Sequence, residues 1–129
     1  MTKEYIAYEG PEFIIEWYYD EKGESQALNF LMDLPANEQR KVFYLFKRLG
    51  DFGKIHDITK FRNEGDSIYA FKPQPHRFLS FFFEGNKIIV TNAFRKKSQK
   101  LPQPEKDKAL KFKKNYLTRF ENGDYYEEE

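Results

Sequence analysis

Residues 67–102 constrain the fold of this chain more than any other stretch, because they combine three short strands with a dense cluster of positive charge. In three runs, side chains two positions apart share one face of a β-strand, as the period of two requires. Gly85 follows the second run and favours a tight turn, so the second and third strands are expected to be antiparallel. Strict alternation through the third run places Ile88 and Phe94 on one face. The runs cover residues 68–72, 77–83 and 88–94.

Positive side chains are expected to gather at one end of these strands. A short loop, residues 73–75, joins the first two strands and places Lys72 and Arg77 near the same end of the sheet. The third strand returns to that end, and residues 95–100 then hold four cations in six positions. Three separate segments are therefore predicted to bring positive charge to one place.

The residues before this stretch predict one strand and two helices. Alternating aromatic and β-branched residues indicate a strand over residues 12–20. Ser25 is a suitable N-cap for a first helix, which Pro35 ends. Asn37 is a suitable N-cap for a second helix, which Gly50 is expected to end in a left-handed conformation.

The complete pattern indicates an α+β fold. Residues 1–11 carry no periodic signal, a short strand is compatible with residues 58–61, and a last helix is expected from about Glu105 to Asn122. The order β-α-α-β-β-β-α then predicts a mainly antiparallel four-stranded sheet packed against helices. We expect residues 1–121 to form a single domain.

The net charge of +1 conceals a strong asymmetry. Residues 86–120 hold eleven Lys and Arg but two acidic residues, whereas residues 121–129 hold five acidic residues and no base. A basic surface of this kind suits nucleic acid or an acidic protein, although a solvated lysine-rich helix would give the same composition. The acidic tail, residues 122–129, is expected to be disordered.

Composition also argues against several classes of protein. Charged residues make up 33% of the chain, which is incompatible with a membrane protein, and the residues after Met1 lack the pattern of a signal peptide, so we expect a cytoplasmic location. Cysteine is absent, and the two histidines have no spaced carboxylate cluster, so no metal site is predicted. The glycines are isolated, so no phosphate-binding loop or small-molecule cofactor is expected.

The central stretch resembles a known toxin family. The run Pro75-His76-Arg77-Phe78 precedes an apolar strand, a turn and a second apolar strand. Phe94-Arg95-Lys96-Lys97-Ser98-Gln99-Lys100-Leu101-Pro102 follows, and then a helix that opens with Glu105 and Ala109. This pattern is similar to the RelE/HigB toxins of bacterial type II toxin–antitoxin systems, and most of all to the phage-derived branch of the RelE/ParE superfamily.

The resemblance implies a compact, microbial-RNase-like fold and ribosome-dependent cleavage of mRNA, which inhibits translation. It also implies a cognate antitoxin with a helix-turn-helix domain. The chain departs from the family at two places: it has Ala70-Phe71-Lys72 where Glu-Leu-Arg is frequent, and Asn92-Ala93 where His-Gly is frequent. No imidazole is therefore available for proton transfer at Asn92.

Cleavage of RNA through its own 2′-OH requires a proton acceptor, a proton donor and positive charge at the phosphate. A lysine can move protons when neighbouring cations lower its pKa. The candidate catalytic residues are Lys72, Arg77, Lys96 and Lys97. The candidate RNA-binding residues are Arg95, Lys100, Lys111 and Lys114. Tyr116 could stack on a base or donate a proton, although its helical spacing fits a core residue better.

Two other functions fit the same sequence. A ParE-like toxin inhibits gyrase by binding it, on the same fold. A non-catalytic relative would only bind nucleic acid. Convergent cations at a site of phosphate size favour the nuclease, because inhibition by binding does not need them.

Overall fold

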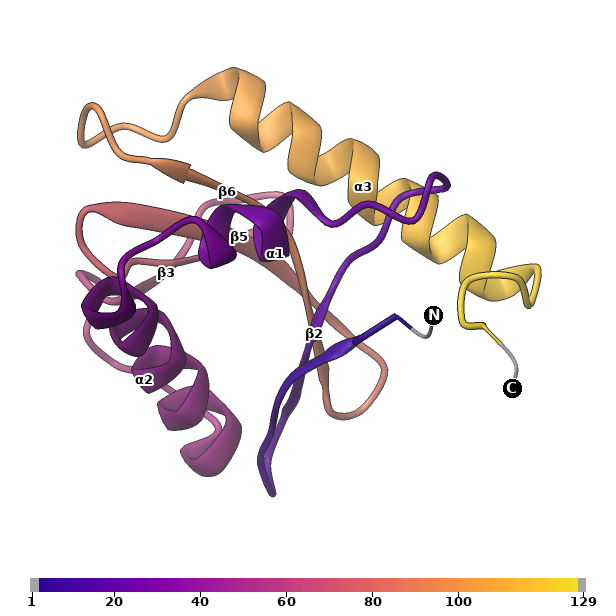
Figure 1. The fold of residues 1–129 in the computed structure, drawn as a ribbon, viewed down its shortest axis with the longest axis horizontal. Coiled ribbons are helices and arrows are strands. Elements are labelled where there is room, and N and C mark those ends of the chain that lie inside the picture. The colour runs from indigo at the N-terminus through magenta and orange to yellow at the C-terminus, as the bar shows by residue number, and fades with distance from the viewer. Residues whose placement is uncertain (1–2, 128–129) are drawn as a thin grey trace.

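A six-stranded mixed sheet of order β1-β2-β6-β5-β4-β3 forms the middle layer of residues 3–127, the part of the chain that the computed structural model describes. Helices α1 and α2 cover one face of the sheet and α3 crosses the other (Figure 1). The strands are β1 (Ile6–Glu9), β2 (Ile14–Trp17), β3 (Phe61–Asn63), β4 (Tyr69–Phe71), β5 (His76–Phe83) and β6 (Lys87–Arg95). The helices are α1 (Gln26–Met32), α2 (Ala36–Phe52) and α3 (Gln103–Glu121).

The α+β class is confirmed, but the prediction of four mainly antiparallel strands is wrong in detail. β1 forms in a segment without periodic signal, where three of its four residues pair with β2 across an irregular register. β3 forms at Phe61–Asn63 rather than over residues 58–61, and its three residues pair with β4. β2 pairs with β6 in parallel. A parallel pair needs a long crossover connection, and here the connection contains α1, α2, β3, β4 and β5. Such short edge strands carry too few residues for a clear pattern.

The helix boundaries confirm Ser25 as the N-cap of the first helix, but Asn37 and Gly50 are not the caps of the second. The Ser25 hydroxyl accepts a hydrogen bond from the Leu28 amide at 3.3 Å, as expected of an N-cap. Helix α2 instead begins directly after Pro35 and continues through Gly50 to Gly53, whose φ of 81° is left-handed. Gly50 is needed for a close approach: a Cβ there would lie 2.8 Å from the Tyr8 ring.

A β-bulge at Thr91 corrects the predicted face of β6. Leu79 is opposite Asn92 but Ser80 is opposite Val90, so Thr91 is an extra residue in β6. Ile88 and Val90 consequently pack with α1 and α2, whereas Phe94 packs on the α3 side. The bulge also shifts Lys96 to the face that carries Lys72 and Arg77.

The predicted disorder of the tail is wrong for the residues up to Glu127. Tyr125 is 2% exposed, and its hydroxyl accepts a hydrogen bond from the Tyr19 amide at 2.9 Å. The Tyr126 hydroxyl donates to Glu16 at 2.6 Å, and Glu127 pairs with Lys3. The remaining two residues of the predicted tail, 128 and 129, lie outside the described part of the chain.

Candidate active site

The predicted convergence of cations occurs at one end of the sheet. Lys72 follows β4, Arg77 lies at the start of β5, and Lys96 follows β6. Together with Lys100 these side chains line a small concavity, which we call the strand-end pocket. Its other lining residues are Glu64, Phe94, Ser98, Gln99, Leu101 and Pro102.

Arg77 is fixed in position at the base of the strand-end pocket. It is 7% exposed, and its NH1 group donates to the His76 carbonyl at 2.8 Å and to Gln74 Oε1 at 3.3 Å. Burial lowers the pKa of the guanidinium, and Glu64 partly opposes this effect. Arginine keeps its charge even so, and a planar donor group held in this way suits a phosphate.

Lys72 has the environment of a lysine that can lose its proton. Its ammonium donates to the Ile58 carbonyl at 3.1 Å. Burial lowers its pKa, and the charges of Arg77, Arg62 and Lys96 lower it further, while Glu64 raises it. A greater fraction of Lys72 is therefore neutral at a given pH than of an exposed lysine.

Lys96 is held at the pocket by the backbone. Its amide donates to the Pro75 carbonyl at 2.8 Å, which ties the end of β6 to the loop before β5. The segment after Lys96 then lines the pocket, and within it the Ser98 hydroxyl donates to the Lys100 carbonyl at 3.2 Å. This segment enters α3 after Pro102.

No ion pair neutralises the cations of the strand-end pocket within the described residues, although the Glu64 carboxylate lines the same pocket and acts on Lys72 and Arg77 from beyond ion-pairing distance. Among residues 3–127, no carboxylate lies within ion-pairing distance of Lys72, Arg77, Lys96 or Lys100, although six other ion pairs are present. Unpaired, partly buried positive charge costs stability, so its presence in a concavity indicates an anionic ligand.

The other predicted site residues lie elsewhere. Arg95 and Lys97 are exposed and do not line the pocket, because alternation at the end of β6 directs only Lys96 inward. On α3, Lys111 is exposed and Lys114 lines a separate shallow depression. Tyr116 is a core residue, as its helical spacing indicated: it is fully buried, and its hydroxyl is hydrogen-bonded to that of Tyr126 at 2.6 Å, so it is not accessible for the alternative role in stacking or proton transfer.

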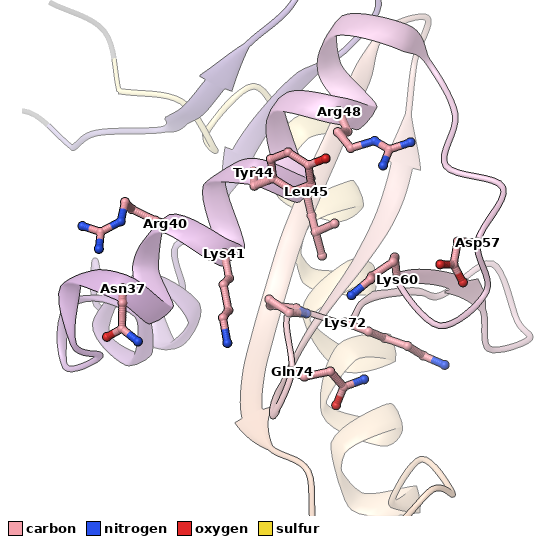
Figure 2. Close-up of a pocket in the computed structure, with 11 residues that line it drawn as sticks. Asn37, Arg40, Lys41, Tyr44, Leu45, Arg48, Asp57, Lys60, Lys72 and Gln74 are labelled. Carbon is pink, nitrogen blue, oxygen red and sulfur yellow. The ribbon is translucent and has the colours of Figure 1, made fainter.

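Sequence reasoning missed a second basic concavity beside the first. Side chains from α2, from the segment before β3 and from the turn after β4 surround a groove of about 610 Å³, which we call the α2 groove (Figure 2). Lys72 lines both concavities. The signal was present in the sequence, since Arg40, Lys41, Tyr44 and Arg48 lie outside the apolar stripe of that helix. The groove is lined by Asn37, Arg40, Lys41, Tyr44, Leu45, Arg48, Asp57, Lys60, Lys72, Pro73 and Gln74.

His76 was also missed, and it links α2 to the strand-end pocket. The ring is 3% exposed, its Nε2 is hydrogen-bonded to Glu38 on α2, and it packs edge-on against Phe30. Its Nδ1 has no hydrogen-bond partner among the described residues. Because Arg77 donates to the His76 carbonyl, this contact ties the position of Arg77 to that of α2.

Residues 3–127 contain neither a metal-binding cluster nor a helix suited to crossing a membrane. No group of three or more His, Asp and Glu side chains in this range is arranged to hold a metal ion. None of the helices in the same range has the length and apolar character needed to cross a membrane.

The class of protein follows from the fold, the basic pocket and a comparison with protein families. Residues 29–114, about two thirds of the chain, match the model of a family within the RelE/HigB-like toxin superfamily. That family is described as "Phage derived protein Gp49-like (DUF891)", and the chain belongs to it. Membership is consistent with the toxin of a toxin–antitoxin system. No curated protein matches the sequence.

Proposed function

We propose that the chain is the toxin of a type II toxin–antitoxin system and acts as an mRNA endonuclease on the ribosome. The observation that carries the proposal is the meeting of Lys72, Arg77 and Lys96, from the ends of three strands, in one concavity where none of them forms an ion pair among residues 3–127. The proposed partners are translated mRNA and a cognate helix-turn-helix antitoxin, and the proposed location is the cytoplasm.

The arrangement suits cleavage through the 2′-OH. The 2′-oxygen attacks phosphorus, the bond to the 5′-oxygen breaks, and the products are a 2′,3′-cyclic phosphate and a 5′-OH. Arg77 neutralises the charge that develops on the phosphoryl oxygens. Lys72, in its neutral form, accepts the 2′-OH proton, and Lys96 donates a proton to the leaving oxygen. Arg95, Lys97 and Lys100 are assigned to the flanking RNA backbone.

Mapping of mRNA 5′ ends tests this function. Expression of the wild-type chain should produce new 5′ ends within translated messages, and the ends should carry a 5′-OH. Cleavage should stop when initiation is blocked, since the proposed substrate is mRNA on the ribosome. Growth arrest without new ends, together with a loss of negative DNA supercoiling, would instead indicate a ParE-like gyrase inhibitor.

The rate of cleavage should rise with pH. Since the pKa of Lys72 is lowered, the neutral amine becomes more abundant as pH increases, and the single-turnover rate should rise up to about tenfold per pH unit below that pKa. In Lys72→Arg this rise should disappear, because arginine stays protonated. A wild-type rate that falls over about pH 6.5–8.5 would contradict the role of Lys72 as proton acceptor.

A further inference from the structure

We propose that the α2 groove binds single-stranded RNA next to the cleaved linkage, with Tyr44 as a stacking surface for a base. The inference rests on the proposed function, since it extends the path of the same RNA strand away from the strand-end pocket. The groove lies between α2 and the segment from Asp57 to Gln74, and side chains from both sides border it (Figure 2).

The charge of the groove favours a polyanion. Five of its eleven lining residues are cations, and Asp57 is its single carboxylate among the described residues. Asp57 accepts hydrogen bonds from the Thr59 amide at 2.9 Å and the Thr59 hydroxyl at 2.6 Å, and its single negative charge leaves the groove with a surplus of positive charge. None of the five cations lies within ion-pairing distance of a carboxylate in residues 3–127. The five are Arg40, Lys41, Arg48, Lys60 and Lys72.

The groove adjoins the strand-end pocket at Lys72. Lys72 belongs to the lining of both, and Gln74, which also lines the groove, accepts a hydrogen bond from Arg77. A strand whose scissile phosphate lies at Arg77 can therefore pass its neighbouring phosphates to the cations of the groove. The hydrogen bond between His76 and Glu38 fixes α2 relative to Arg77, so the two concavities keep one geometry.

Tyr44 gives the groove an aromatic surface that charge alone does not explain. Its side chain is 58% exposed, and the Arg48 guanidinium lies 5.9 Å from the centre of its ring. Exposed aromatic rings beside cations form the sites on which unpaired bases stack. Arg40 and Arg48 are eight residues apart, or about 12 Å along the helix. That length corresponds to about three nucleotides of a stacked strand.

An acidic segment of a protein is the other ligand that a basic groove could accept. RNA is favoured because the groove adjoins the cations of the strand-end pocket and presents an exposed aromatic ring for a base. The affinities of the same variants for an RNA probe and for an acidic peptide probe distinguish these two ligands.

The test is the affinity of the full chain for a fluorescein-labelled, 2′-O-methyl single-stranded RNA of twelve nucleotides, measured by anisotropy over a range of salt. This probe cannot be cleaved, so the result does not depend on the nuclease activity. Tyr44→Ala should weaken binding about tenfold, whereas Tyr44→Phe should bind like the wild type. The double variant Arg40→Gln/Arg48→Gln should reduce the slope of log K against log salt by about 1.4.

The matched control removes two charges outside the groove. Lys22 is exposed in a turn, and Lys47 lies on α2 but pairs with Asp51, so Lys22→Gln/Lys47→Gln should leave the slope within experimental error of the wild type. Equal slopes for the two double variants, or equal affinities for Tyr44→Ala and Tyr44→Phe, would overturn the proposal. Groove variants that bind RNA normally but lose affinity for a polyglutamate probe would assign the groove to an acidic protein instead. Groove-dependent binding without any mRNA cleavage would refute the nuclease and not the groove.

Discussion

Arg77→Ala is expected to reduce mRNA cleavage about 100- to 1,000-fold, the range typical for loss of one preorganised group that stabilises a transition state. Arg77 is the most deeply buried cation of the strand-end pocket, and hydrogen bonds to Gln74 and to its neighbour's carbonyl orient it. Within residues 3–127, these two bonds involve NH1 alone, which leaves Nε and NH2 to donate to a phosphate. The measurement is the single-turnover rate of mRNA cleavage on ribosomes programmed with a defined message.

The loss should come from chemistry and not from unfolding. Arg77 has no carboxylate within ion-pairing distance among the described residues, so its removal leaves no unpaired buried charge. The Tm of Arg77→Ala should consequently stay within about 4 °C of the wild type. Arg77→Lys should recover little activity, since an ammonium group cannot reproduce the planar donor pair. Lys22→Ala is the surface control, and cleavage by Arg77→Ala at the rate of this control would refute the assignment.

The strand-end pocket could be predicted because antiparallel neighbours return the chain to the same end. Once Lys72 and Arg77 are joined by a short loop, their proximity follows from connectivity. Lys96 was expected there on the same grounds, but strict alternation along β6 would have placed it on the face of Ile88, opposite Arg77. The bulge at Thr91 settles that face, and no local pattern in the sequence indicates an extra residue within a run of β-branched residues.

The α2 groove could not be predicted in the same way. One side comes from α2 and the other from the segment before β3 and the turn after β4. Their approach depends on tertiary packing between Phe46 and Phe71, whose rings lie 4.9 Å apart. The amphipathic pattern identified which side of α2 is buried, but an exposed basic side has many possible neighbours. The contact between His76 and Glu38 likewise joins residues 38 positions apart, and no periodic signal reports such a pair.

The acidic tail shows how composition can mislead. Residues 121–129 hold five acidic residues, which is typical of a disordered terminus, yet they also include Tyr125 and Tyr126. The Tyr126 hydroxyl connects Tyr116 on α3 with the buried carboxylate of Glu16 on β2. Lys87 completes this network, with its ammonium 3.3 Å from the Glu16 carboxylate. Two aromatic side chains therefore anchor the segment despite its charge.

Tyr125→Ala is accordingly expected to lower the free energy of unfolding by about 3 kcal/mol, the lower end of the range for removing a large buried aromatic ring. The Tyr125 ring is 2% exposed, lies 4.4 Å from the centre of the Tyr116 ring, and carries the Arg119 guanidinium at 4.7 Å. The Tm should fall by about 10 °C. Urea denaturation followed by tryptophan fluorescence measures the change, because Trp17 is the one tryptophan of the chain.

Tyr125→Phe separates packing from hydrogen bonding. It keeps the ring but removes the hydroxyl that accepts from the Tyr19 amide, so it should cost about 1 kcal/mol. If the tail were disordered, neither variant would lose stability. If the loss in free energy of unfolding were smaller for Tyr125→Ala than for Tyr125→Phe, the ring would not be packed. Because Tyr125 contacts the end of α3 remote from Pro102, both variants should cleave mRNA at the wild-type rate at temperatures well below their Tm. The anchored tail would then serve the stability of the domain, separately from the reaction proposed at the strand-end pocket.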